Sequence, residues 1–315
     1  MLVAHPVKDQ TRTVLTVGGN ALIRPGEEGS VAEQWERASQ LAELIAQLPA
    51  EMQLILTHGN GPQVGRVLLR SDLCSSNVPP VPIDMAVAAT QGQMGIMLQQ
   101  AIESIAKRPT TTLLTQVLVR SDDPAFQDPK KFIGRFYTHA EALQKAANLG
   151  WTVKEDPGRG WRRVVASPRP YEIVEKAAID ALLKANITVI ACGGGGVPVI
   201  RLDDRLVGVE AVVDKDRSSA LLAHMVGADQ LVCLTGVDEV MVDFGLPTAR
   251  AIRRASLTEI SNFLDAGEFP EGSMAPKIRS AMQFLIDGGK RVIITSPERL
   301  TEALADSAGT HLVPD

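Results

Sequence analysis

The sequence has little of what marks several large classes of protein. It contains three cysteines, Cys74, Cys192 and Cys233, at no metal-binding spacing, so we expect free thiols in a reducing compartment. No apolar run is long enough to span a bilayer, and residues 1–12 contain no apolar core of a signal peptide. These absences predict a cytoplasmic protein without a membrane partner.

Excess positive charge is missing as well. The 32 lysines and arginines are outnumbered by 37 aspartates and glutamates, which leaves a formal net charge of −5. A nucleic-acid partner usually requires a basic face, so none is expected. Aromatic residues make up only 4% of the chain, but apolar residues make up 45%, enough for the core of one large α/β domain or two smaller ones.

Apolar runs of strand length alternate with segments of helical periodicity along most of the chain. Two helices are marked by capping boxes, Ser30 with Glu33 and Ser256 with Glu259. The central strands are expected at 13–17, 52–57, 111–119, 187–192, 230–235 and 291–296. Such alternation is typical of βαβ units, so we predict an α/β fold around a mostly parallel sheet.

One segment, residues 121–168, departs from this alternation. It contains half of the chain's aromatic residues, a dense mixture of charges and only short pieces between turns. We predict that it is an inserted subdomain or lid outside the main sheet. A long surface excursion with a small core of its own is the alternative, and the two interpretations are compatible.

Three of the predicted strands end in glycine-rich turns: VGGNAL (17–22), THGNGPQVG (57–65) and CGGGGVPV (192–199). Ligands of an open α/β sheet bind at the carboxyl ends of its strands, where glycine lets backbone N–H groups approach an anion. One such turn is equally well explained by tight packing of a strand against a helix, but three favour a polyphosphate site. The P-loop pattern GxxxxGK[ST] is absent, and GNGPQVG does not match the dinucleotide fingerprint.

Lysines from separate segments are the second sign of a phosphate site. Phosphoryl transfer asks the protein mainly for positioning and for positive charge around the moving group. The flanking aspartates could orient a lysine or approach Mg²⁺, although each charged residue taken alone is typical of an exposed loop. The candidates are Lys130 and Lys131 in the inserted segment, Lys215 between Asp214 and Asp216, and Lys277 near a helix start.

The order of these motifs resembles that of the carbamate kinases, which belong to the amino acid kinase fold. The motifs are GGNAL, THGNGPQVG, ASPRP, ACGGGGVPV, VVDKD, LTGVDEV and GSMAPK, and EDPGRGWRRVVASPRP (155–170) is especially specific. The similarity extends from about residue 13 to about residue 300. It implies a single domain over 1–315, built as a three-layer αβα sandwich, with a protruding lid inserted at 121–168.

The resemblance also implies roles for individual residues. Lys215 and Lys277 would contact nucleotide phosphates, Asp216 would organise the lysines, and Lys131 would reach carbamate or carbamoyl phosphate. The phosphoryl group would move between Gly18, Gly19, Asn20, Gly59, Asn60 and Gly61, with Gly193, Gly194, Gly195 and Gly196 on the carbamate side. Thr235, Val237, Met241 and Met274 would border the nucleotide, and no side chain is assigned as a direct metal ligand.

Three positions depart from the family pattern. Phe132 and Arg135 stand where relatives commonly have proline, which should loosen that loop, and Lys130 offers a second candidate for the role of Lys131. Met241 stands where relatives often have a tyrosine that could stack on adenine, so nucleotide affinity could differ here. His58 is the one histidine inside a motif, and we expect it to have a structural or positioning role.

The implied reaction is ATP + carbamate ⇌ ADP + carbamoyl phosphate, with Mg²⁺. A homodimer and ATP synthesis during the breakdown of arginine or other nitrogen compounds are implied in the same way. Two alternatives remain at this point: a related kinase that phosphorylates another carboxylate, and a nucleotide-binding regulator without catalysis. The inserted segment and GRGWRRVVASP disfavour the first, and the presence of all the lysines and Asp216 disfavours the second.

Overall fold

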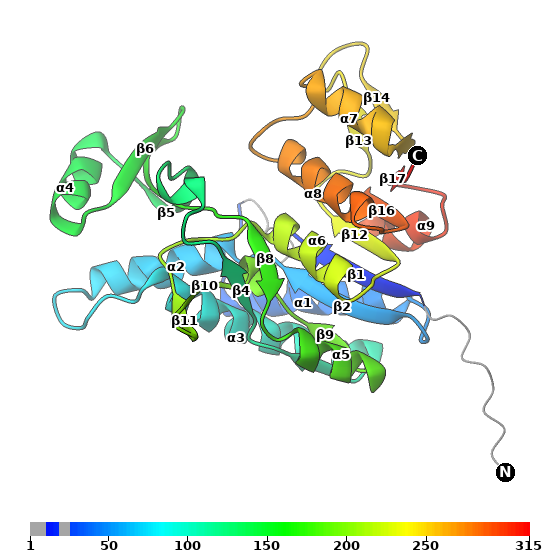
Figure 1. Cartoon of the computed structure of the whole chain (residues 1–315), viewed down its shortest axis with the longest axis horizontal. Coiled ribbons are helices and arrows are strands. Elements are labelled where there is room, and N and C mark those ends of the chain that lie inside the picture. The colour runs from blue at the N-terminus through cyan, green and yellow to red at the C-terminus, as the bar shows by residue number, and fades with distance from the viewer. Residues whose placement is uncertain (1–10, 19–25) are drawn as a thin grey trace.

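The computed structural model describes residues 11–18 and 26–315, and its centre is an eight-stranded sheet (Figure 1). Six neighbouring strands, from β16 to β3, run parallel, whereas β17 is antiparallel to β16. The prediction of a mostly parallel central sheet is therefore confirmed. In spatial order the strands are β15 (Arg254–Ser256), β17 (Thr310–Val313), β16 (Arg291–Thr295), β12 (Gln230–Leu234), β1 (Arg12–Val17), β2 (Gln53–His58), β9 (Thr188–Ile190) and β3 (Thr110–Thr112).

Successive side chains of these strands enter two different buried clusters, one on each face of the sheet. In β1, Val14 belongs to the first cluster and Leu15 to the second, as strand geometry requires. Helices cover both faces, so the α/β fold is the expected three-layer αβα sandwich. The first face is covered by α5 (Lys176–Lys184), α6 (Lys215–Met225), α7 (Leu257–Asp265) and α8 (Met274–Ile286), and the second by α1 (Val31–Ala46), α3 (Ile83–Ala101) and α9 (Leu300–Leu304).

The helix starts follow the capping signals of the sequence. In α1 the Ser30 side chain accepts from the Glu33 N–H, and the Glu33 carboxylate accepts from the Ser30 N–H. The same reciprocal pair joins Ser256 and Glu259 at the start of α7. Both predicted capping boxes are confirmed, and each satisfies N–H groups that a helix start would otherwise leave unpaired.

The segment 111–119 is not one strand, as its apolar pattern predicted, but two. β3 belongs to the central sheet, whereas residues 116–119 belong to a second, four-stranded sheet. Between them the Gln91 side chain of α3 accepts from the Thr115 N–H and donates to the Thr115 carbonyl, which also accepts from the Val197 N–H. The order of the second sheet is β11 (Arg205–Gly208), β10 (Val197–Leu202), β4 (Gln116–Val119) and β8 (Pro170–Ile173).

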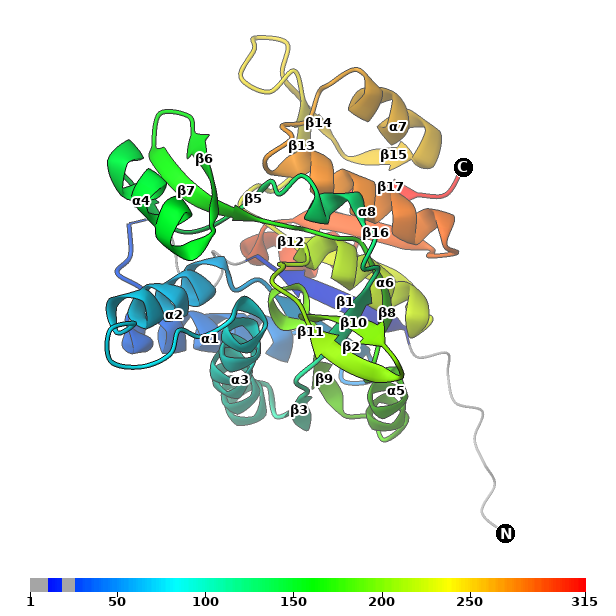
Figure 2. The ribbon, with the colours of Figure 1, turned by 60° about the vertical axis from the view of Figure 1, so that its left-hand side comes forward.

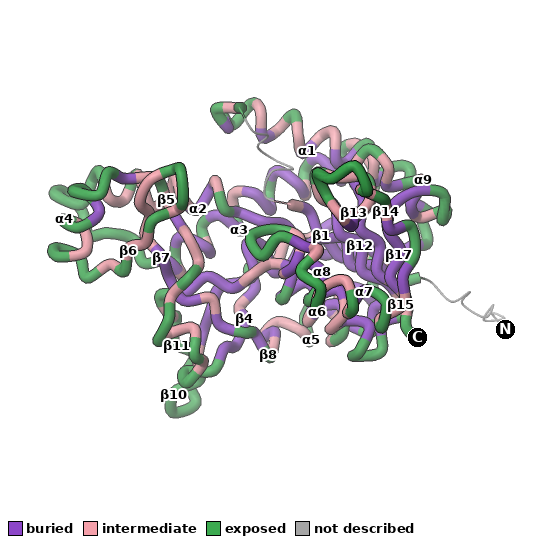
Figure 3. Tube along the Cα trace, turned by 90° about the horizontal axis from the view of Figure 1, so that it is seen from above, coloured by how far each residue is buried: buried purple, intermediate pink, exposed green. Residues whose placement is uncertain are grey.

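Residues 131–165, which we call the outer sheet, form a three-stranded antiparallel sheet and one helix that project from the body beside α2 (Gly61–Leu73) (Figure 2). A third buried cluster attaches the outer sheet, since it contains Ile133 and Val165 together with Val64 of α2. Figure 3 shows that this projection is largely exposed or half-buried, in contrast to the central strands. Its elements are β5 (Lys131–Tyr137), α4 (His139–Leu149), β6 (Thr152–Asp156) and β7 (Gly160–Val165).

Aromatic and basic side chains of the outer sheet stack on one another. The Arg162 guanidinium carbon lies 5.6 Å from the centre of the Phe132 ring, and that of Arg135 lies 4.5 Å from the centre of the Tyr137 ring. Phe132 and Arg135, the two departures in this segment, thus take part in cation–π contacts that restrain β5. The lid over 121–168 stays a prediction as a moving unit.

Two short strands between β12 and α7 belong to neither of the larger sheets. β13 (Val240–Val242) and β14 (Arg250–Ile252) form a separate antiparallel pair near α7 (Figure 1). In the part of the chain that the structure describes, no helix combines the length and apolar character needed to cross a bilayer.

Candidate active site

Four neighbouring strands of the central sheet bring the predicted turns to one edge. The sheet order β12, β1, β2, β9 places the residues after each carboxyl end side by side. These are Thr235 after β12, Gly18 after β1, Gly59 to Gly61 after β2, and Gly193 to Gly196 after β9. Gly19 and Asn20, which the resemblance also assigns to this edge, lie outside the described residues.

The four consecutive glycines have a packing reason that lies within the protein. A Cβ added at any of them would lie less than 3.0 Å from another atom, and Gly194, Gly195 and Gly196 have positive φ angles. The crowding atoms belong to His58 for Gly193, Asn60 for Gly194, the Val213 carbonyl for Gly195 and Val117 for Gly196. The β9 turn is thus wedged between the β2 turn, the segment before α6 and the second sheet.

The backbone N–H groups of these turns are only partly available to an anion. The N–H groups of Gly59, Gly195 and Gly196 already donate to carbonyl oxygens of Val17, Cys192 and Gly193. The Asn60 side chain does not cap α2, because it donates to Thr90 Oγ1 at 2.8 Å. The first N–H groups of α2 therefore have no side-chain acceptor, and a helix N-terminus of this kind suits an anion.

The sequence Asp214-Lys215-Asp216 forms the start of α6. Asp214 is the N-cap and accepts from the Asp216 N–H at 2.9 Å. Lys215 is the first helical residue, and its Nζ donates to Asp216 Oδ1 at 2.7 Å and to Thr16 Oγ1 at 3.3 Å. Because Thr16 lies near the carboxyl end of β1, two residues before Gly18, Lys215 reaches the edge of the sheet where the turns meet.

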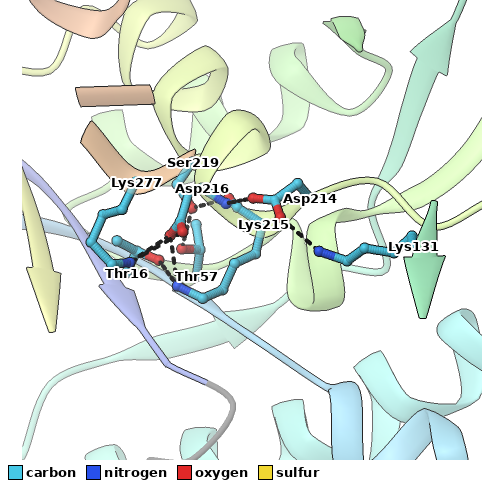
Figure 4. A network of polar contacts seen from close by, with 8 residues as sticks. All are labelled: Thr16, Thr57, Lys131, Asp214, Lys215, Asp216, Ser219 and Lys277. Carbon is cyan, nitrogen blue, oxygen red and sulfur yellow. Dashed lines mark hydrogen bonds and ion pairs between the residues drawn. The ribbon is translucent and has the colours of Figure 1, made fainter. Parts of the chain in front are cut away.

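Two lysines from distant parts of the chain join this group (Figure 4). Lys277 of α8 lies 3.1 Å from both carboxylate oxygens of Asp216, and Lys131 of β5 lies 2.8 Å from Asp214 Oδ2. The side chains are 8% exposed for Lys277, 17% for Lys215 and 39% for Lys131. The first two are thus held by the protein core, whereas Lys131 arrives from the projecting outer sheet.

Lys130 has different surroundings from its neighbour. Its Nζ lies 2.6 Å from Asp128 Oδ2, and this ion pair is largely exposed. Neighbouring residues of an extended chain point to opposite sides, so only one of the two lysines can face α6. The structure brings Lys131, and not Lys130, to the group formed by Lys215 and Lys277.

The acidic residues of the site stay ionised because of their lysines. Burial would raise the pKa of Asp216, but the charges and hydrogen bonds of Lys215 and Lys277 outweigh it and lower that pKa. Burial likewise opposes the ionisation of Asp214, and the charge of Lys131 lowers its pKa overall. For Lys277 burial lowers the pKa, whereas Asp216 raises it above its usual value, so the ammonium keeps its charge.

His58 is fully buried beside the glycine turn, and burial lowers its pKa to about 4. The unfolded chain takes up a proton near pH 6.5, so it binds more protons than the native state between pH 6.5 and pH 4. We expect the free energy of unfolding to fall by about 2 kcal/mol from pH 7 to pH 5 on account of His58. Urea titrations at both pH values, for the native chain and His58→Gln, measure this, and an equal pH dependence in the variant would contradict it.

Several polar residues of the site were not predicted from the sequence. Thr57 Oγ1 and Ser219 Oγ are 2.7 Å apart, and Ser219 also donates to the Lys215 carbonyl. Ser218 donates to the Gly195 carbonyl at 2.6 Å, which ties α6 to the glycine turn. The two serines follow Lys215 at helical spacing and face the sheet, and that spacing is the signal that could have identified them.

The residues predicted to border the nucleotide come from three parts of the chain: the loop after β12, the strand β13 and the start of α8. Thr235 follows β12, and its N–H donates to the Thr295 carbonyl. Met274 is the first residue of α8, three positions before Lys277. Val237 follows in the same loop as Thr235, and Met241 pairs with Ala251 in the β13–β14 ladder. All four side chains are half-buried and so remain accessible in part.

The described residues contain no cluster of three or more His, Cys, Asp and Glu side chains that could hold a metal ion. The two carboxylates closest to the lysines are already used, since all four of their oxygens accept hydrogen bonds from lysines or from a backbone N–H. Both aspartates are thus paired with lysines in this structure.

Comparison with known proteins gives one consistent family. The model of the amino acid kinase family matches residues 11–296. A carbamate kinase of Thermococcus kodakarensis is 43% identical over 96% of this chain and 99% of its own length. A carbamate kinase-like protein of Escherichia coli is also 43% identical, over 95% of this chain and 98% of its own length.

Solved structures agree with this result. A carbamate kinase of Giardia lamblia bound to AMP-PNP superposes with a TM-score of 0.92 and 38% sequence identity. The match covers 98% of this chain and 99% of the Giardia chain. Fold, length and the order of elements are therefore shared with an enzyme that was solved with a nucleotide analogue.

Proposed function

The chain belongs to the amino acid kinase family, and on that premise we propose that it catalyses phosphoryl transfer between ATP and carbamate, ATP + carbamate ⇌ ADP + carbamoyl phosphate. The protein is a phosphotransferase that uses a nucleotide. The observation that supports the choice of carbamate is full-length similarity to carbamate kinases, combined with three lysines that converge on two ionised aspartates. Location in the cytoplasm stays a prediction.

The chemistry needs charge neutralisation more than proton transfer. Carbamate is already an anion, so its oxygen needs no general base, which agrees with a His58 that is buried and neutral near pH 7. The difficulty is that an anionic nucleophile approaches an anionic triphosphate. Fixed ammonium groups offset this repulsion, and because they are held in advance they need not reorganise during the reaction.

The lysines divide this work according to their positions. Lys215 and Lys277, held by Asp216 at the carboxyl edge of the sheet, contact the nucleotide phosphates. Lys131, which the outer sheet carries, contacts the carbamate or carbamoyl phosphate. The glycine turns and the N-terminus of α2 line the path of the phosphoryl group, and Thr235, Val237, Met241 and Met274 border the nucleotide.

Magnesium would be supplied to this site with the nucleotide phosphates. Mg²⁺ is usually held by substrate phosphates, water and one or two carboxylates, and not by an all-protein cage. The described residues contain no cluster of three or more His, Cys, Asp and Glu side chains, so they supply no dedicated magnesium ligand set, and no step depends on one.

The direct test is the reverse reaction. ADP and carbamoyl phosphate are supplied with Mg²⁺, and ATP formation is followed by a coupled assay. We expect robust ATP formation, with no comparable activity when acetyl phosphate replaces carbamoyl phosphate. Activity with an acylated amino acid and ATP, but not with carbamate, would favour the related carboxylate kinase, and binding of nucleotide without any turnover would favour a regulator.

The two neighbouring lysines of the inserted segment provide a matched pair of variants. We expect Lys131→Ala to lower kcat/KM for carbamoyl phosphate about 100-fold, because it removes a cation that faces the reacting anion. Lys130→Ala should change it less than about threefold, since that side chain forms an exposed pair with Asp128. The reverse order of effects would assign the lid function to Lys130.

A homodimer remains part of the proposal. The outward face of α3 exposes Met85, Ala89, Gly92 and Ile96 at helical spacing, and an apolar stripe of this kind suits contact with a second copy. ATP synthesis during breakdown of nitrogen compounds is the direction we propose.

A further inference from the structure

The two aspartates at the start of α6 form ion pairs with three lysines, and each aspartate has different lysine partners. Asp216 accepts from Lys215 and Lys277, whereas Asp214 accepts from Lys131 alone among the three. We propose that Asp214 is a positioning residue: it holds the lysine of the outer sheet over the reacting group and so connects the lid to the helix that carries Lys215. This inference rests on the proposed function of the same site.

The backbone and the ammonium group of Lys131 contact different parts of the protein. Its backbone is fixed at the base of the outer sheet, where Lys131 pairs with Val165, a buried member of the third cluster. Its Nζ extends to Asp214, 83 positions away in the sequence, and stops 2.8 Å from Oδ2 (Figure 4). Among the described residues, Asp214 is the one acidic partner of this ammonium. A long, 39% exposed lysine would otherwise sample many rotamers.

Asp214 can hold Lys131 without blocking it. An ammonium group donates three hydrogen bonds, and Asp214 accepts one of them, which leaves two for the oxygens of a carbamate or phosphate. The other carboxylate oxygen of Asp214 accepts from the Asp216 N–H and caps α6. One carboxylate thus contacts both the outer sheet and the helix that presents Lys215, so the position of the lid and the position of the helix are linked.

A simpler role must be separated from this one. As an N-cap, Asp214 would stabilise α6 even if its contact with Lys131 had no effect on the reaction. Asparagine is about as good an N-cap as aspartate, so Asp214→Asn keeps the cap and removes the charge. If Asp214 acts only as an N-cap, Asp214→Asn removes a negative charge from a site for anions and should raise kcat/KM. If Asp214 positions Lys131, the same substitution should lower kcat/KM.

The experiment is a double-mutant cycle in the ATP-forming reaction. We expect Asp214→Asn to lower kcat/KM for carbamoyl phosphate about tenfold, with the KM for ADP changed less than about twofold. In the Lys131→Ala background the same substitution should change kcat/KM less than about twofold, because the lysine that it positions is gone. Asp128→Asn, which removes the exposed partner of Lys130, is the matched control and should leave kcat/KM unchanged.

Hydrogen exchange supplies a readout that does not depend on turnover. We expect amide exchange across β5 to be several times faster in Asp214→Asn than in the native chain, with no further change when Lys131 is also replaced. An unchanged or raised kcat/KM, or an equal fall in both backgrounds, would overturn the proposal. If the native chain forms no ATP, the proposed function fails, while the exchange result still decides whether Asp214 holds the outer sheet.

Discussion

Replacing Lys215 by alanine should lower the rate of ATP formation from ADP and carbamoyl phosphate by two to four orders of magnitude. Lys215 is the first helical residue of α6, and its Nζ lies at the sheet edge between Thr16 and Asp216. Each tenfold in rate corresponds to about 1.36 kcal/mol, so this loss means about 3 to 5 kcal/mol of transition-state stabilisation. Initial rates at saturating substrates measure it.

The same variant should fold normally, which makes the loss interpretable. Asp216 keeps Lys277 as a partner when Lys215 is removed, so no buried carboxylate is left without a cation. Lys184→Ala, at the exposed end of α5, is the matched control and should retain full activity. A Lys215→Ala protein that unfolds at the native urea midpoint and turns over within tenfold of the native rate would remove Lys215 from the catalytic group.

Gly195→Ala should cause the largest loss of stability of any single methyl group added to the site. Gly195 has a φ of +95°, and a Cβ there would lie less than 3.0 Å from the Val213 carbonyl oxygen, an atom of the backbone. Strain at positive φ and overpacking each cost about 1–3 kcal/mol, so we expect the free energy of unfolding to fall by about 2–6 kcal/mol. Urea unfolding followed by circular dichroism measures the change.

Gly272→Ala is the control for this substitution. Gly272 is exposed, has no positive φ, and no atom lies within 4 Å of the added Cβ, so the change should stay within about 0.5 kcal/mol. If the free energy of unfolding of Gly195→Ala lies within about 1 kcal/mol of the native value, the turn can accommodate a Cβ despite the close contacts. Glycine would then be kept there for the ligand and not for packing.

Local patterns identified most of the fold because they depend on neighbouring residues alone. Capping boxes at Ser30 and Ser256, apolar strand runs and glycines at strand ends are all short-range signals, and they predicted the α/β fold and its mostly parallel sheet correctly. The prediction of one strand over 111–119 was wrong because the structure there depends on residues far away in the chain. The segment breaks at Thr115, whose backbone is bound by Gln91 of α3 and by Val197 of β10, and these contacts come from segments distant in the chain.

The candidate site shows the same division. The sequence alone identified the lysines and the Asp-Lys-Asp motif by type, but Lys130 and Lys131 could not be told apart, since both are lysines in one exposed segment. The tertiary structure distinguishes them, because Lys131 of β5 pairs with Asp214, whereas Lys130 pairs with Asp128. Thr16 and Thr57 had no distinctive signal, and only the packing of β1 and β2 against α6 brings them to Lys215 and Ser219.

The sequence by itself determined the family, the alternation of strands and helices and the chemical types gathered at the strand ends, because these follow from motifs, residue identity and periodicity within a few turns. Only the tertiary structure showed which lysine pairs with which aspartate, and which neighbouring atoms leave no room for side chains at residues 193–196. The reason is physical: ion pairs and close contacts act over a few ångströms in space, and sheet order sets that separation between segments far apart in the chain.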